Sequence, residues 1–211
     1  MVSESVRISF SKTGRLKYIS HLDLCRTMQT AMIRAKIPLR YTEGFNPHPK
    51  MIFTQPLPLF AESECELLDI RLTEDMPHEE ICARLRKEFA DGLYINKVYE
   101  PLSKFGEISY ALYKITGFES ARERELEELL SGEIAVKKKT KDGKEKVIDI
   151  RPLVRSLERR EDALEALLGA APDSYLNPDT LCRSMCERGL GKGAYGILRI
   201  GWYRGDMSPF E

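Results

Sequence analysis

The sequence lacks several features that would assign it to a class of protein directly. No run of about 18 apolar residues occurs, and the N-terminus lacks the basic-then-apolar pattern of a secretory signal. Cysteine is scarce: the five present are an odd number, without the spacing of a disulfide framework. These absences predict a cytoplasmic protein with reduced thiols and no membrane partner.

Motifs of common enzymes are also missing. The sequence holds neither a phosphate-binding G-K-[ST] loop nor the G-x-S-x-G of serine hydrolases. The segment 191–196 matches G-x-G-x-x-G, but it follows a predicted helix and leads into a strand, which is the wrong context for a dinucleotide site. Cys182 and Cys186 would open a C-x3-C-x2-C iron–sulfur motif, whose third position is Gly189. We therefore expect no cofactor and no metal in this chain, and nothing in it establishes an enzyme.

The formal net charge is zero, but the charges are unevenly placed. Residues 1–50 are basic, residues 51–105 lean acidic, and residues 137–160 are basic again. Segregated patches of this kind are compatible with a nucleic-acid or acidic-protein partner.

Hydrophobic periodicity predicts an α+β fold. Val6, Ile8 and Phe10 alternate with polar residues as in a half-buried strand, and a helix capped by Ser20 follows. The remaining pattern of the first half predicts strands at 51–57, 68–72 and 93–99, and a helix that Asp75 opens. Strand, helix, strand, strand, helix, strand is the order of a ferredoxin-like split βαβ arrangement.

The second half repeats this plan less clearly. It predicts a strand at 108–116, a helix capped by Ser120, a hairpin around 141–144, a helix opened by Asn177 and a last strand from Ile197. The segment 151–176 is compatible with strand or helix. We therefore predict two tandem ferredoxin-like halves, residues 1–104 and 105–211, each an antiparallel sheet with helices on one face.

The segment Tyr41-Thr-Glu-Gly-Phe-Asn-Pro-His-Pro-Lys50 has the most unusual local chemistry in the chain. Gly44 permits a positive φ, and two prolines restrict the backbone on either side of the histidine. A stiff loop of this composition is a candidate ligand site, and a purely structural turn is the alternative. The candidate ligand-binding residues are Tyr41, Glu43, Phe45, Asn46, His48 and Lys50.

Two further groups of residues are candidates for function. A hairpin rich in lysine, with the arginines that follow it, is suited to contact a phosphate backbone, although charged edges also serve solubility. Its candidate nucleic-acid-binding residues are Lys137, Lys138, Lys139, Lys141, Lys144, Arg151 and Arg155. If the start of the first helix and the loop lie on one rim of the sheet, a catalytic or metal-binding group becomes possible. Its candidate members are His21, Asp23, Glu43 and His48.

Several motifs together resemble one bacterial family. They are Lys17-Tyr-Ile-Ser-His-Leu-Asp23, the 41–50 segment, Pro56-Leu-Pro-Leu59, Asp69-Ile70 and Ile148-Asp-Ile-Arg-Pro152. In these the chain resembles the radical SAM-linked proteins, which are encoded beside or fused to a radical SAM protein that often carries a cobalamin-binding domain. The resemblance implies a radical SAM partner that holds the iron–sulfur cluster, the SAM and, in some cases, cobalamin. It brings no catalytic residue to this chain.

The basic patches, the aromatic loop and the sheet together suggest an accessory module that binds transfer or ribosomal RNA for modification by that partner. One alternative is a protein-interaction subunit that docks on the partner without touching RNA. Another is an RNA-processing enzyme that uses His21 and His48.

Overall fold

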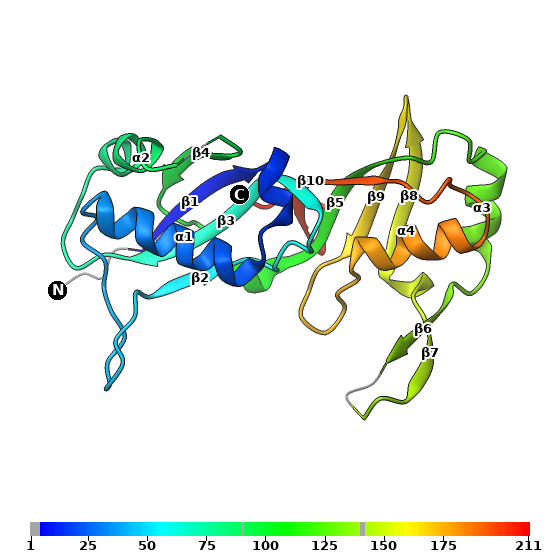
Figure 1. The fold of residues 1–211 in the computed structure, drawn as a ribbon, viewed down its shortest axis with the longest axis horizontal. Helices are drawn as coiled ribbons and strands as arrows, with labels where there is room; N and C mark the ends of the chain where they lie inside the picture. The colour runs from blue at the N-terminus through cyan, green and yellow to red at the C-terminus, as the bar shows by residue number, and fades with distance from the viewer. Residues whose placement is uncertain (1–4, 90, 140–141) are drawn as a thin grey trace. The chain divides into compact units, whose positions relative to one another are not determined.

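The computed structural model describes residues 5–89, 91–139 and 142–211. They form a mixed α+β structure whose sheet pairings are mostly antiparallel, with four α-helices among these residues. The chain divides into two compact units (Figure 1). Unit 1 contains the residues up to Phe105 together with Glu211, and unit 2 contains Gly106–Phe210.

Unit 1 has four strands and two α-helices among its described residues. In chain order its elements are β1 (Ser5–Lys12), η1 (Gly14–Tyr18), α1 (His21–Arg34), β2 (Met51–Phe53), β3 (Ala61–Arg71), α2 (His78–Arg86), β4 (Leu93–Tyr99) and the start of η2 (Phe105–Glu107). Antiparallel pairing joins β4 to β1, β1 to β3, and β3 to β2. The strands therefore follow one another across the sheet in the order fourth, first, third, second.

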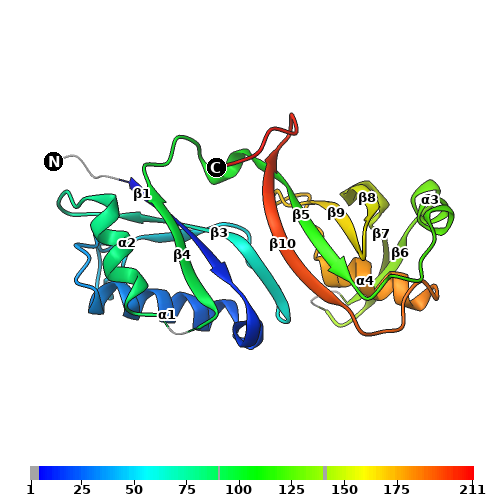
Figure 2. The same ribbon diagram turned by 90° about the horizontal axis from the view of Figure 1, so that it is seen from above.

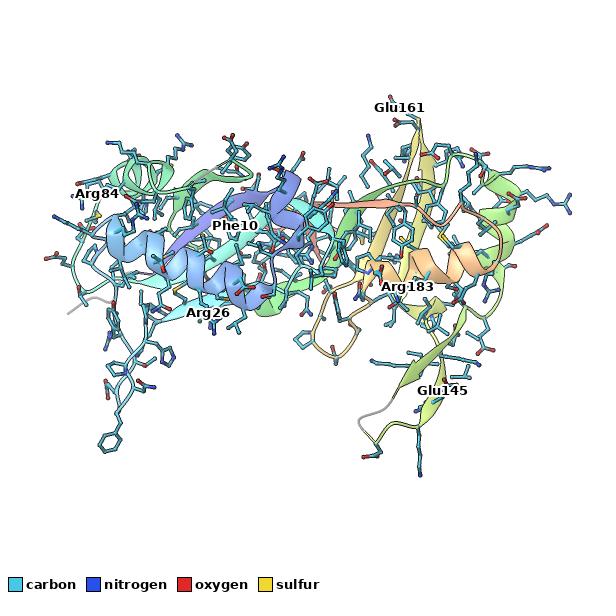
Figure 3. The ribbon with its side chains drawn as sticks, viewed as in Figure 1. Phe10, Arg26, Arg84, Glu145, Glu161 and Arg183 are labelled. Atoms are coloured by element: carbon cyan, nitrogen blue, oxygen red, sulfur yellow. The ribbon has the colours of Figure 1, made fainter. Side chains whose placement is uncertain are left out.

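One core holds unit 1 together. The alternating Val6, Ile8 and Phe10 of β1 are fully buried, as period-2 patterning predicts, and they pack with Met28 of α1 and Leu85 of α2. Both helices therefore contribute to the core on the same face of the sheet (Figure 2). Figure 3 labels Phe10 of β1, whose side chain is fully buried.

Unit 2 contains the remaining described elements. They are β5 (Ile108–Thr116), α3 (Glu123–Ser131), β6 (Ala135–Lys139), β7 (Glu145–Asp149), η3 (Arg151–Leu153), β8 (Val154–Arg160), β9 (Ala163–Gly169), α4 (Pro178–Glu187) and β10 (Gly196–Arg204). Antiparallel pairing joins β10 to β5, β5 to β9, and β9 to β8. Strands β6 and β7 form a separate two-stranded sheet that projects from the unit (Figure 1).

Local sequence signals explain where two of the helices begin. The Ser20 hydroxyl accepts a hydrogen bond from the Asp23 N–H at 3.1 Å, and the Asn177 side chain accepts one from the Asp179 N–H at 3.0 Å. Both residues satisfy a backbone donor that the helix leaves unpaired. The two caps predicted from sequence are confirmed.

Two other predicted caps are wrong. Helix α2 begins after Pro77, whose carbonyl accepts from the Glu80 and Ile81 N–H groups, and not at Asp75. Helix α3 begins after Arg122 and not at Ser120, because residues 118–121 form a turn in which the Ala121 N–H donates to the Phe118 carbonyl. The ambiguous segment 151–176 contains β8 and β9, and the predicted strand 51–57 is limited to β2.

A buried ion pair crosses the sheet of unit 1. Arg7 of β1 lies opposite Asp69 of β3, and its guanidinium donates to both carboxylate oxygens, at 2.7 and 2.9 Å. The same group donates to the main-chain carbonyls of Ser103 and Glu211 and packs 4.3 Å from the Phe105 ring centroid. A fully buried cation thus has acceptors and a ring around it, as burial of a charge requires.

In the described part of the chain, no helix has the length and apolarity needed to cross a bilayer.

The Arg7–Asp69 pair generates a stability prediction. Replacing Asp69 by Ala leaves the buried guanidinium without its carboxylate, which should lower the free energy of unfolding by about 3–5 kcal/mol in urea titrations. The matched control is Asp162→Ala, which removes an exposed carboxylate 3.8 Å from Lys114 and should leave the midpoint nearly unchanged. Similar midpoints for the two variants would contradict this account.

Candidate functional site

A projecting loop between α1 and β2 is the main candidate site of unit 1 (Figure 1). Three chain segments meet at its base. The Arg40 N–H donates to the Arg71 carbonyl at 2.7 Å, and the Lys50 N–H donates to the Arg40 carbonyl at 2.8 Å. Leu39 and Leu72 form the next bridge. The loop therefore emerges from an extension of the β3 edge.

Above this base the two arms of the loop pair with each other. The Thr42 N–H donates to the His48 carbonyl at 2.8 Å, the His48 N–H donates to the Thr42 hydroxyl at 3.1 Å, and Tyr41 bridges Pro49. Gly44 has a φ of +125°, a positive value of the kind that glycine permits. Thr42, which sequence reasoning did not select, organises the narrow ribbon.

The tip of the loop is exposed. The Phe45 ring has a relative accessibility of 109%, and Glu43, Asn46 and His48 are exposed as well. Tyr41 retains 42% of its accessibility at the base, and Lys50 is half-buried. The His48 ring lies 3.2 Å from the Thr42 hydroxyl and 3.3 Å from the Asn46 carbonyl. The predicted ligand-binding residues thus lie together on one projecting ribbon.

A groove of about 550 Å³ lies at the base of the loop. Its lining residues are Arg40, Thr42, His48, Pro49, Lys50, Met51, Ile52 and Arg71. Three of these eight side chains are basic, and none is acidic. Arg40 and Arg71 are therefore site residues that the sequence alone did not indicate, because only the pairing at the β3 edge brings them together.

His21 and Asp23 lie at the other end of α1. Asp23 accepts a hydrogen bond from the Ser20 hydroxyl at 2.6 Å. The His21 ring packs edge-on against Phe53, with centroids 5.3 Å apart, and its Nε2 lies 3.5 Å from Cys25 Sγ. Desolvation lowers the pKa of His21, while it raises the pKa of Cys25. Both groups are thus kept neutral, which disfavours a thiolate–imidazolium pair.

The predicted group of two histidines and two carboxylates does not assemble. The loop follows the C-terminal end of α1, whereas His21 is the first residue of that helix (Figure 1). The 14 residues of α1 span about 21 Å. Within residues 5–89, 91–139 and 142–211, no three His, Cys, Asp or Glu side chains are grouped so as to hold a metal ion. The length of α1 lies between the helix start and the loop, which the sequence prediction had placed on one rim.

The basic hairpin of unit 2 is exposed. Lys138 of β6 lies directly opposite Lys146 of β7, so these two ammonium groups share one face of the ribbon. Lys137 points to the other face, where its Nζ lies 3.7 Å from the Glu145 carboxylate. Lys144 is exposed, whereas the side chain of Lys139 and all of Lys141 lie outside the described residues.

The two predicted arginines after the hairpin differ. Arg151 donates from Nε to the Leu130 carbonyl at 2.5 Å and from Nη1 to the Val154 carbonyl at 2.9 Å, so its guanidinium joins the end of α3 to the start of β8. Arg155 is exposed on β8. Arg151 therefore has a structural role that the charge pattern did not reveal.

Fold and site together define an α+β protein with an exposed aromatic loop above a cationic groove. The chain belongs to a bacterial family with the description "Uncharacterized protein conserved in bacteria (DUF2344)", whose model matches residues 5–178. Among curated proteins, none matches this sequence.

The lowered pKa of His21 makes stability depend on pH. The folded state resists protonation of this ring, so its contribution to stability is complete above the ordinary pKa of 6.5 and is lost as the pH falls below it. We expect the wild type to lose more free energy of unfolding between about pH 7.5 and about pH 5.5 than a His21→Gln variant does. Equal losses in urea titrations of the two proteins would contradict the burial effect.

Proposed function

We propose that this chain is an accessory module that binds RNA and presents it to a partner protein for modification. The observation that carries the proposal is the fully exposed Phe45 ring, at the tip of a self-paired ribbon whose base is lined by Arg40, Lys50 and Arg71. An exposed ring is available for stacking on an unpaired base, and nearby cations attract the phosphate backbone.

The architecture supports the same proposal by analogy. The order fourth, first, third, second across the sheet occurs in both units, and we propose that they are tandem ferredoxin-like halves, the second with an inserted hairpin. Sheets of this type serve elsewhere as platforms for RNA. The cationic hairpin β6–β7 would supply a second contact to the backbone.

The partner we propose is a radical SAM protein. This follows from the resemblance of the 17–23 and 41–50 motifs to the radical SAM-linked proteins. Gly189 occupies the third position of the cysteine motif in this chain. The iron–sulfur cluster, the SAM and any cobalamin would then belong to the partner, and this chain would supply recognition.

One observation favours a second candidate function. A projecting aromatic side chain is also typical of a hot spot in a protein interface, where it fills a pocket of the partner. The loop would then dock on the partner protein without RNA. In contrast, a catalytic pair of His21 and His48 is disfavoured, because α1 separates the helix start from the loop.

The first test is removal of the ring. Phe45→Ala should weaken binding of a short single-stranded RNA by about 5- to 150-fold, since stacking on one aromatic contributes about 1–3 kcal/mol. Fluorescence anisotropy at low ionic strength measures the effect. Leu102→Ala is the matched control, because this residue is also almost fully exposed, at 95%, and lies outside the loop.

The outcomes separate the two candidate functions. No binding of RNA by the wild type, even at low salt, would contradict the proposed function. Co-purification with the partner that Phe45→Ala abolishes and ribonuclease leaves intact would instead support docking on protein.

The hairpin gives a second test. Replacing Lys138 and Lys146 by Gln removes two like charges from one face, so folding should not suffer, and RNA affinity should fall with a shallower dependence on salt. The charge-matched control is Arg26→Gln/Arg183→Gln, which removes two charges from exposed, ion-paired positions on α1 and α4. If the slope of log affinity against log salt is unchanged in the double variant, the hairpin does not contact the RNA.

A further inference from the structure

The groove below the loop has the features of a phosphate-binding site. Arg40 and Lys50 enter it from the two ends of the loop, and Arg71 enters it from the end of β3. The main-chain bonds from Arg40 to Arg71 and from Lys50 to Arg40 hold the backbones of these three residues side by side. The cations are therefore brought together by the fold and not by a single flexible segment.

The charge in the groove is not balanced by its own lining. None of the eight lining residues is acidic. Neither Arg40 nor Lys50 forms an ion pair with another residue that the structure describes. Elsewhere in unit 1, two arginines do face carboxylates, since Arg84 faces Glu80 and Arg34 faces Glu88. A concentration of like charge costs repulsion, which a bound anion would relieve.

The size and composition of the groove narrow the class of anion. Its volume of about 550 Å³ exceeds what a lone phosphate fills and falls within the range of sites for organic ligands. Met51 and Ile52 add an apolar surface, and Ile52 keeps 59% of its accessibility. The suitable ligand therefore combines a phosphate with an apolar, flat portion, as a nucleotide does.

The tip of the loop is within reach of the same ligand. Phe45 is five residues from Arg40 and five from Lys50, so its Cα lies no more than about 18 Å from either. A single strand of a few nucleotides spans this distance. One base can then stack on the ring while a phosphate of the same strand occupies the groove.

We infer that the groove formed by Arg40, Lys50 and Arg71 binds a nucleotide phosphate of a single-stranded RNA segment. This inference rests on the proposed function and specifies its ligand as an unpaired strand. The guanidinium groups of Arg40 and Arg71 offer the forked donors that suit phosphate oxygens, and the Lys50 ammonium adds a point charge. The phosphate comes either from within the strand or from its end.

The test compares charge-matched double variants. Arg40→Gln/Arg71→Gln should weaken binding of a labelled single-stranded RNA and reduce the slope of log affinity against log salt by about 0.7, because the groove neutralises one phosphate and each neutralised phosphate contributes about 0.7 to the slope. Arg26→Gln/Arg183→Gln removes the same charge from exposed, ion-paired positions on α1 and α4 (Figure 3) and should preserve the slope. Arg40→Gln/Lys50→Gln provides a second groove variant that leaves Arg71 in place.

Two oligonucleotide arms distinguish the sources of the phosphate. If the ligand is a strand end, a 5′-phosphorylated RNA binds more tightly than the same RNA without it, and the groove variants abolish the difference. If the ligand is an internal phosphodiester, both RNAs lose affinity equally in the groove variants. Either result supports the groove.

The remaining outcomes overturn the inference in different ways. If the groove variants bind RNA as tightly as the wild type and Phe45→Ala binds it more weakly, the groove is not a phosphate site, and the proposed function still holds. A wild type that binds no RNA, although inorganic phosphate shifts the amide NMR signals of Arg40, Lys50 and Arg71, would leave an anion site and overturn the RNA ligand together with the proposed function. Absence of both effects would overturn the site and the function.

Discussion

The pairing of β3 along its edge is the constraint on which the candidate site depends. Strand β3 pairs with β1 on one side and with β2 on the other, and the second ladder continues past β2 to Arg40 and Leu39. Because register in a sheet is set by which face must be buried, a slip of one residue would turn Leu68 and Ile70 out of the core. The same slip would also separate Arg40 from Arg71, which line the groove. Core packing and the cation cluster therefore both depend on how β3 pairs with its neighbours.

The buried Arg7 reinforces this register. Its guanidinium meets the Asp69 carboxylate only when β1 and β3 are aligned as observed, so a shifted alignment would bury an unpaired charge. Hydrophobic alternation alone allows slips of two residues, which keep the same face inward. The ion pair disfavours those alternatives. The polar pair in β1 and β3 thus selects among registers that the apolar residues tolerate equally.

Sequence reasoning succeeded where a local signal determines the structure. Strands β4 and β5 have the predicted bounds, because a turn at Gly92 precedes the first and the link 101–106, which begins with Pro101 and ends with Gly106, separates the two. Asp75 and Ser120 failed as caps because each helix begins two residues later than such a cap requires, after Pro77 and Arg122, which are not residues that commonly cap helices. In the site, the exposed loop was recognisable from its prolines and glycine. Arg40 and Arg71 were not, since they are distant in sequence and only strand pairing makes them neighbours.

The hairpin β6–β7 has its own ladder and shares none with the four-stranded sheet of unit 2. At its root, Asp149 accepts from the Ile134 and Arg151 N–H groups, which closes the insertion where it leaves the body of the unit. Loop length changes the entropy of closure only slowly, and little apolar surface is buried along the ribbon. The length and charge of this hairpin can therefore change during evolution without altering the core of unit 2. Differences among relatives in this segment would reflect what the hairpin binds far more than how the protein folds.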